Sequence, residues 1–88
     1  MKLIIAIVGD SDAEAVVQNL IGAGFRVTRL ASTGGFLRKG NTTLLLGTEA
    51  DRIDEAIGHM RTATAEPPAH DRRRGTVFVL DIDRFEQF

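Results

Sequence analysis

The sequence predicts an α+β fold of the ferredoxin-like kind, a βαββαβ sandwich in which two helices cover one face of an antiparallel sheet. Two observations lead to this prediction. Four short runs are rich in Val, Ile, Leu and Thr, and the stretches after the first and third runs have apolar residues at helical spacing. The chain has 88 residues and is 43% hydrophobic, which is enough for one core, so we expect residues 1–88 to form a single domain.

The first strand and the first helix are predicted on either side of a Gly-Asp pair. Residues 2–8 form a short run rich in β-branched side chains. Asp10, Ser11 and Asp12 then offer oxygens that can cap a helix, and Gly24 suits the left-handed residue that closes one. The apolar positions between them fall at i, i+3, i+4, i+7 and i+8, namely Ala13, Val16, Val17, Leu20 and Ile21.

The second and third strands are expected at residues 25–31 and 42–46. The second helix is expected from residue 48 or 49 to about residue 64, with Asp51 after Thr48 as a weak capping-box signal. Two prolines and three consecutive arginines then predict a loop, and the last strand is expected at residues 76–82.

The predicted strands are apolar at consecutive positions, as in LIIAIV, TLLLG and TVFVLDI. A sheet with one face in water would alternate apolar and polar residues. Because the two helices cover only one face, something else must cover the other. The simplest cover is the same sheet of another copy, so we predict a homo-oligomer with cyclic symmetry.

Composition and charge disfavour several classes of protein. The formal net charge of -1 gives no overall field to hold a nucleic-acid backbone, so no nucleic-acid partner is expected. There is no cysteine, and therefore no disulfide framework or cysteine zinc site. The apolar run Leu3–Val8 is too short for a signal-peptide core or a membrane span, and we expect a cytoplasmic protein without a membrane partner.

The stretch TRLASTGGFLRKGNTTLLLG, residues 28–47, carries most of the candidate binding groups. Its glycine spacing is close to that of a phosphate-binding P-loop, but a strand follows where that motif needs a helix, so we reject the P-loop. Gly34 and Gly35 either let the backbone approach a ligand or form only a turn. Phe36 and Leu37 either stack on a flat heterocycle or pack on their own domain.

Arg26 and Thr28 lie two residues apart, so they share one face of the second strand, while Arg29 points to the other face. An arginine and a threonine side by side suit phosphate oxygens. The alternative is an arginine in solvent at a sheet edge.

We predict no catalytic or metal site. His59 and His70 have no ligand partner at metal spacing, and neither serine has a histidine that the sequence places beside it. Asp81 and Asp83 share a strand face, but paired acids alone are typical of a solvated surface. We therefore expect a protein that is not an enzyme and has no metal or cofactor.

The string FRVTRLASTGGFLRKGNTTLLLG, with AIVGDSDA before it and GTVFVLDIDRFEQF at the end, resembles the PII-like cyclic-di-AMP receptor family. Proteins of that family are small cytoplasmic homotrimers of ferredoxin-like subunits, similar to PII signal-transduction proteins. They bind cyclic di-AMP in the clefts between subunits. The resemblance implies the same fold, assembly and nucleotide ligand for this chain, and a signalling role with a downstream protein partner.

The resemblance also implies a set of ligand-binding residues, some of them from the neighbouring subunit. The set consists of Arg26 and Thr28 at the phosphates, Gly35, Phe36, Leu37 and Asn41 around one adenine, Gly47 lining the cleft, and Phe78 and Gln87 completing the pocket.

The chain departs from the family between the second helix and the last strand. The family usually has a long loop with an extra strand there, thought to communicate the ligand state to partners, whereas residues 65–74 alone fill that gap here. Two other hypotheses stay open. One is a trimer that binds another adenine nucleotide such as ATP, and the other is a ligand-free trimer that docks a partner through Arg72 to Arg74.

Overall fold

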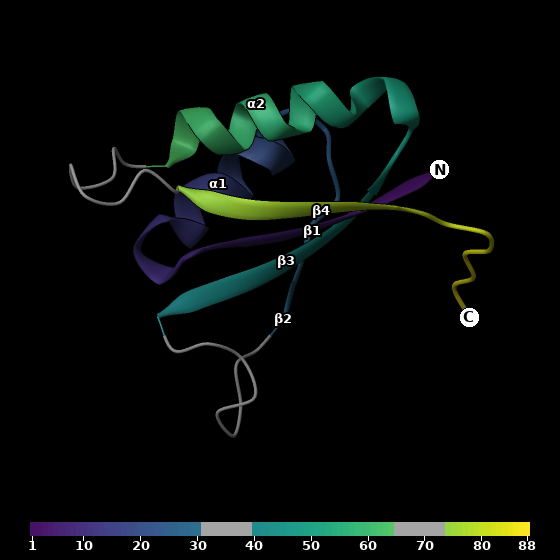
Figure 1. Ribbon diagram of the computed structural model, residues 1–88, viewed down its shortest axis with the longest axis horizontal. Coiled ribbons are helices and arrows are strands. Elements are labelled where there is room, and N and C mark those ends of the chain that lie inside the picture. Colours follow the sequence, from purple (N-terminus) through teal and green to yellow (C-terminus); the bar gives the residue numbers. More distant parts are fainter. Residues whose placement is uncertain (31–39, 65–73) are drawn as a thin grey trace.

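The computed structural model describes residues 1–30, 40–64 and 74–88. Its strands form one antiparallel sheet in the order β2-β3-β1-β4, and both helices lie on the same face of that sheet (Figure 1). The ferredoxin-like prediction is therefore confirmed. The elements in chain order are β1 Lys2–Gly9, α1 Asp10–Gly22, β2 Thr28–Leu30, β3 Asn41–Thr48, a 3-10 turn at Ala50–Arg52, α2 Ile53–Ala63 and β4 Gly75–Asp81.

The predicted end of the first helix is confirmed. Gly24 has a φ of 91°, in the left-handed region, and its N–H donates to the carbonyl of Ile21 at 3.0 Å. The N–H of Phe25 donates to the carbonyl of Leu20, also at 3.0 Å. These two bonds form a Schellman motif, which satisfies the last carbonyls of α1 and turns the chain back toward the sheet.

The prediction for the second strand was wrong in extent. β2 is only Thr28–Leu30, and residues 25–27 lie outside it. The reason is the closure of α1: Phe25 is held against the helix end and buried in the core, so the chain reaches the sheet edge only at Thr28. Of the predicted residues, Ala31 lies outside the described part of the chain.

The predicted helix caps were also wrong. The N-cap of α1 is Gly9, and Asp10 is already the first helical residue, with no side-chain cap bond. The carboxylate of Asp10 instead accepts a hydrogen bond from the Thr42 hydroxyl on β3. The predicted start of the second helix is a 3-10 turn, in which the N–H of Arg52 donates to the carbonyl of Glu49, and α2 follows without a side-chain cap.

The last two strands differ from their predicted bounds by a few residues. β3 is longer than residues 42–46, because it pairs with β1 along its whole length, from Gly9↔Asn41 to Lys2↔Thr48. β4 begins and ends one residue earlier than predicted.

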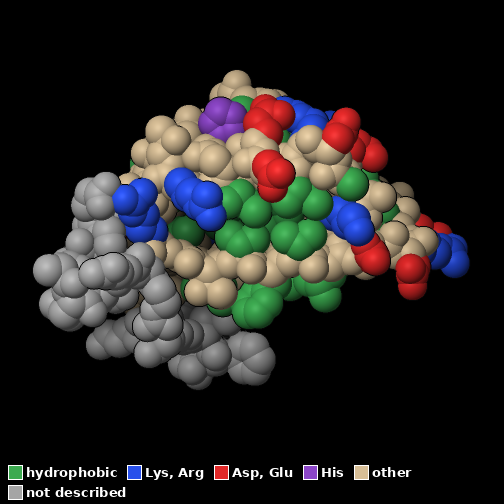
Figure 2. Space-filling view, turned by 45° about the horizontal axis from the view of Figure 1, so that its top comes forward, with side chains coloured by type: hydrophobic (Ala, Val, Ile, Leu, Met, Phe, Trp, Pro, Cys, Tyr) green, Lys and Arg blue, Asp and Glu red, His purple; other side chains and the backbone are tan. Residues whose placement is uncertain are grey.

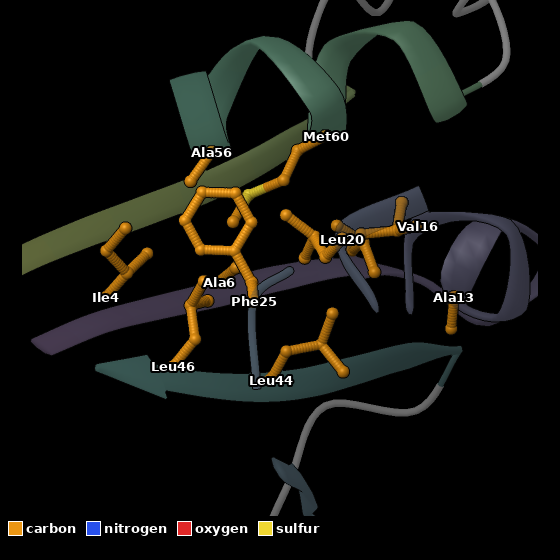
Figure 3. Packing of buried hydrophobic residues seen from close by; sticks show 11 residues of the cluster. Ile4, Ala6, Ala13, Val16, Leu20, Phe25, Leu44, Leu46, Ala56 and Met60 are labelled. Carbon is orange, nitrogen blue, oxygen red and sulfur yellow. The ribbon is translucent and has the colours of Figure 1, made fainter. Parts of the chain in front are cut away.

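The core lies between the sheet and the two helices. Alternate residues of β1 and β3 point toward the helices and are buried there, which the consecutive apolar letters of the sequence did not reveal. In Figure 3 the ring of Phe25 lies between α2 and the strands, with Met60 beside it. The buried hydrophobic residues are Ile4, Ala6, Val8, Ala13, Val16, Leu20, Phe25, Leu44, Leu46, Ala56 and Met60.

Arg52 joins the end of α1 to the start of α2. Its guanidinium lies over the ring of Phe25, with the central carbon 4.1 Å from the ring centroid, and donates to the carbonyl of Ala23 at 3.0 Å. It also pairs with Glu55 at 2.9 Å. The cation–π contact and the bond to a helix-terminal carbonyl hold the two helices together at this end.

Candidate functional site

The face of the sheet away from the helices carries the predicted ligand residues that lie on strands. The strand registers place four side chains of this face in one row across the sheet, Thr28, Leu45, Ile5 and Phe78. Hydrophobic side chains of this side project at the lower edge of the molecule in Figure 2. Phe78 is 54% exposed and Leu80, in the neighbouring row, 46%. We call this surface the open face.

Thr28 and Gly47 lie at one corner of the open face, and Arg26 precedes Thr28 by two residues. Thr28 pairs with Leu45, so Gly47, two residues further along β3, is its diagonal neighbour, about 7–8 Å away. Arg26 lies before the first residue of β2, so no strand pairing fixes its position relative to β3. Arg26 and Thr28 are both exposed, while Val27 between them packs on the core. Because Arg26 lies outside β2, its sharing of a face with Thr28 stays a prediction.

Phe78 lies at the opposite edge of the sheet from Thr28. Three strand spacings separate the two residues in their common row, about 14 Å. Within one subunit, therefore, the backbone arrangement keeps Phe78 away from the corner of Thr28 and Gly47.

Asn41 begins β3 at the far end from Gly47. The two residues are six positions apart on one strand and on the same face, which places them about 20 Å apart. Asn41 pairs with Gly9 and is partly exposed. Its neighbours on both sides are bonded to Asp10: the carbonyl of Gly40 accepts from the Asp10 N–H, and the Thr42 hydroxyl donates to the Asp10 carboxylate.

The C-terminal segment starts near the corner that holds Gly47. The N–H of Ile82 donates to the carbonyl of Met1 at 3.2 Å, and the Met1 sulfur would lie 3.6 Å from a Cβ placed at Gly47. Gln87 is exposed five residues beyond Ile82, at most about 17 Å of extended chain. The contact of Met1 with Gly47 was not predicted, because nothing in the local sequence indicates which strand end lies beside the N-terminus.

The remaining predicted ligand residues, Gly35, Phe36 and Leu37, lie outside the described residues, as do His70, Arg72 and Arg73.

Arg29 points to the helix side of the sheet, as predicted from its spacing to Arg26. Its Nη2 donates to Oε2 of Glu14 on α1 at 3.0 Å. This hydrogen bond is the main reason that the pKa of Glu14 is lowered, and a second bond from Gln18 adds to the effect. Arg29 is therefore engaged with α1, on the other side of the strand from Thr28.

The described residues also bear on metal sites and on membrane-spanning helices. In residues 1–30, 40–64 and 74–88, no group of three or more His, Cys, Asp or Glu is arranged to hold a metal ion. Among the helices of the same residues, none is long and apolar enough to cross a membrane.

Comparison with known proteins identifies the family. The sequence profile described as "Cyclic-di-AMP receptor" matches residues 1–67. The chain belongs to the cyclic-di-AMP receptor family. The match confirms the family predicted from the glycine-rich stretch, and it ends within the connection that follows α2, where the chain departs from the usual family pattern.

A solved structure is similar over nearly the whole chain. It is the crystal structure of a functionally unknown protein from Pediococcus pentosaceus ATCC 25745, with 37% sequence identity and a TM-score of 0.76. The alignment covers 99% of this chain and 96% of that chain. The alignment therefore leaves little of either chain unmatched.

Proposed function

We propose that the protein is a receptor for cyclic di-AMP, which acts as a homotrimer and binds the ligand where two subunits meet. The observation that carries the proposal is the family match over residues 1–67. Seven of the nine predicted ligand residues, from Arg26 to Gly47, fall inside this stretch, and only Phe78 and Gln87 lie beyond it.

The geometry of the sheet supports a ligand site shared by two subunits. Arg26 and Thr28 lie at the β2 edge, and Phe78 lies at the β4 edge of the same face. Placing the β4 edge of one subunit beside the β2 edge of the next brings an aromatic ring to the arginine and threonine. An arginine is suited to the phosphates and an aromatic ring to the adenine.

The exposed apolar area of the open face supports assembly. A single copy leaves Leu30, Phe78 and Leu80 between 37% and 54% exposed, next to partly exposed residues of β1 and β3. An apolar surface that extends over all four strands marks an interaction site in a chain of this size. In a cyclic trimer whose open faces meet, the same contacts cover this surface on each of the three subunits.

Calorimetry tests the ligand and light scattering tests the assembly. Cyclic di-AMP is titrated into the full chain, with ATP and AMP as alternative ligands, and the molar mass is measured by size-exclusion chromatography with light scattering. We expect saturable heat with cyclic di-AMP, one site per subunit, and a trimer mass. Absence of heat at high micromolar cyclic di-AMP contradicts the ligand, stronger binding of ATP replaces it, and a monomer mass contradicts the shared site.

A further inference from the structure

We propose that Asp10, which makes no ligand contact in the proposed site, is a positioning residue for Asn41. It binds the residues on both sides of Asn41 and so fixes the end of β3 that would face the adenine. The inference rests on the proposed function. It concerns a residue that is not among the proposed cyclic di-AMP contacts.

Two hydrogen bonds define the arrangement. The backbone N–H of Asp10 donates to the carbonyl of Gly40 at 2.9 Å, and Oγ1 of Thr42 donates to Oδ1 of Asp10 at 2.5 Å. Gly40 and Thr42 are the direct neighbours of Asn41. One residue at the start of α1 thus holds the chain before and after Asn41, 31 positions away in the sequence.

Among the described residues, the other support for this end of β3 comes from its pairing with β1. Asn41 is the first residue of β3, and its partner Gly9 is the last residue of β1 and has no side chain. The described residues of β2 pair only with residues 43–45 of β3, so they do not reach Asn41. Gly40 has a φ of 89°, which sets a sharp change of direction just before the strand.

The bonds act from behind the strand. Thr42 belongs to the row of Val8, on the helix side of the sheet, while Asn41 points to the open face. The Asp10 carboxylate therefore lies on the opposite side of β3 from the proposed ligand. It can fix the backbone around Asn41 without blocking the site. Asp10 can therefore affect binding only through the position of the β3 backbone.

A simpler role for Asp10 is to place a negative charge in the first turn of α1, where it interacts favourably with the helix dipole. Asp54 has the same role in α2 and serves as a matched control, since it is exposed in the first turn of its helix. If charge at a helix start were all that matters, Asp10→Ala and Asp54→Ala would change stability alike and leave binding unchanged.

The test compares variants of Asp10 and Thr42 by calorimetry with cyclic di-AMP, well below their unfolding temperatures. Asp10→Ala and Thr42→Val each remove the same hydrogen bond and should weaken binding by about three- to tenfold. The double variant should bind no more weakly than either single one. Asp10→Asn keeps an acceptor oxygen and Thr42→Ser keeps the hydroxyl, so both should retain wild-type affinity, as should Asp54→Ala.

Several outcomes overturn the inference, and they can be told apart from failure of the proposed function. If the unmodified chain gives no heat with cyclic di-AMP, the proposed function fails and this inference fails with it. If the unmodified chain binds and Asp10→Ala binds equally well, only the inference fails. It also fails if Thr42→Ser loses as much affinity as Thr42→Val, or if Asp54→Ala weakens binding as much as Asp10→Ala.

Discussion

The two faces of the sheet are made by the same strands but differ in how much of their side chains is exposed. On the helix side, Ile4, Ala6 and Leu44 have no exposed surface. On the open face, Phe78 and Leu80 remain about half exposed. The change occurs between neighbouring residues of β3, where Leu44 is buried under the helices and Leu45 points the other way and is partly exposed.

This difference separates the residues that maintain the fold from those proposed to act in binding. Along β1 and β3 the helix side is covered within one chain by the apolar sides of α1 and α2, while Val79 at the β4 edge stays 43% exposed. The open face is apolar along β1 and at Leu45 of β3, and no helix of the described residues lies over it. Because side chains alternate along a strand, substitutions of adjacent residues should therefore have effects on different properties.

The largest expected difference is between Leu44→Ala and Leu45→Ala. Leu44 is fully buried in the core, so its truncation should lower the free energy of unfolding by about 2–5 kcal/mol at every protein concentration. Leu45→Ala should act mainly on association, so its effect should depend on protein concentration. Urea unfolding at several concentrations measures both. Equal losses that do not depend on concentration would show that the open face is not an assembly surface.

The next comparison is between Arg26→Ala and Arg29→Ala. Arg26 is exposed just before β2 and is the proposed phosphate contact, so its loss should weaken cyclic di-AMP binding by roughly 1.5 to 3 kcal/mol, the range for a charge-assisted hydrogen bond. Arg29 pairs with Glu14 on the helix side, so its removal should leave the affinity unchanged. Calorimetry on both variants checks the prediction. If only Arg29→Ala lost binding, the phosphate contact would belong to the helix side of the sheet and the proposed role of Arg26 would be wrong.

Gly47→Ala should change stability and binding in opposite directions. A Cβ at Gly47 would meet only the Met1 sulfur at 3.6 Å and the Lys2 carbonyl at 3.9 Å, which are ordinary contacts. The variant should therefore be as stable as the original chain or up to about 1 kcal/mol more stable, because alanine restricts the unfolded chain. The added methyl group should lower the affinity for cyclic di-AMP, since Gly47 is expected to line the cleft.

Gly75→Ala is the matched control for this effect. A Cβ at Gly75 would lie 2.9 Å from the carbonyl oxygen of Ile7, so this variant should lose stability. Thermal unfolding and calorimetry on both variants separate the two cases. Wild-type affinity in Gly47→Ala would remove Gly47 from the ligand site.

The sequence was sufficient for the order of the elements but not for their pairing. Apolar runs and helical spacing predicted the strands and both helices, and Gly24 predicted the end of α1. The row that joins Thr28 to Phe78 depends on strand order and register, which arise from contacts far apart in the chain. For the same reason, Asp10 was interpreted as a helix cap, although the structure bonds its carboxylate to Thr42 on β3.

The site was predictable only where family resemblance supplied residue roles. Spacing alone predicted that Arg26 and Thr28 share one face, and this stays a prediction because Arg26 lies outside β2. It could not show that Gly47 lies beside Met1, or that Asn41 and Gly47 are at opposite ends of β3. Those facts follow from the fold, because they depend on which chain segments meet at each end of the sheet.

The smallest expected effect is a loss of folding stability at low pH. It comes from carboxylates outside the open face. Hydrogen bonds from Arg29, Arg52 and Lys2 are the main causes that lower the pKa values of Glu14, Glu55 and Asp81. A carboxyl group whose pKa is lower in the folded state stabilises the fold above its unfolded pKa, and this contribution is lost as the pH falls through the folded value.

We therefore expect a triple variant, with Glu14→Gln, Glu55→Gln and Asp81→Asn, to be slightly less stable than the original chain at neutral pH and equally stable in strong acid. Because all three carboxylates are at the surface, the difference should shrink when salt is added. Urea unfolding as a function of pH, at low and high salt, measures it. A difference that grows toward acid would mean that these ion pairs oppose folding. The affinity for cyclic di-AMP at neutral pH should stay unchanged in this variant, since the three pairs lie away from the open face.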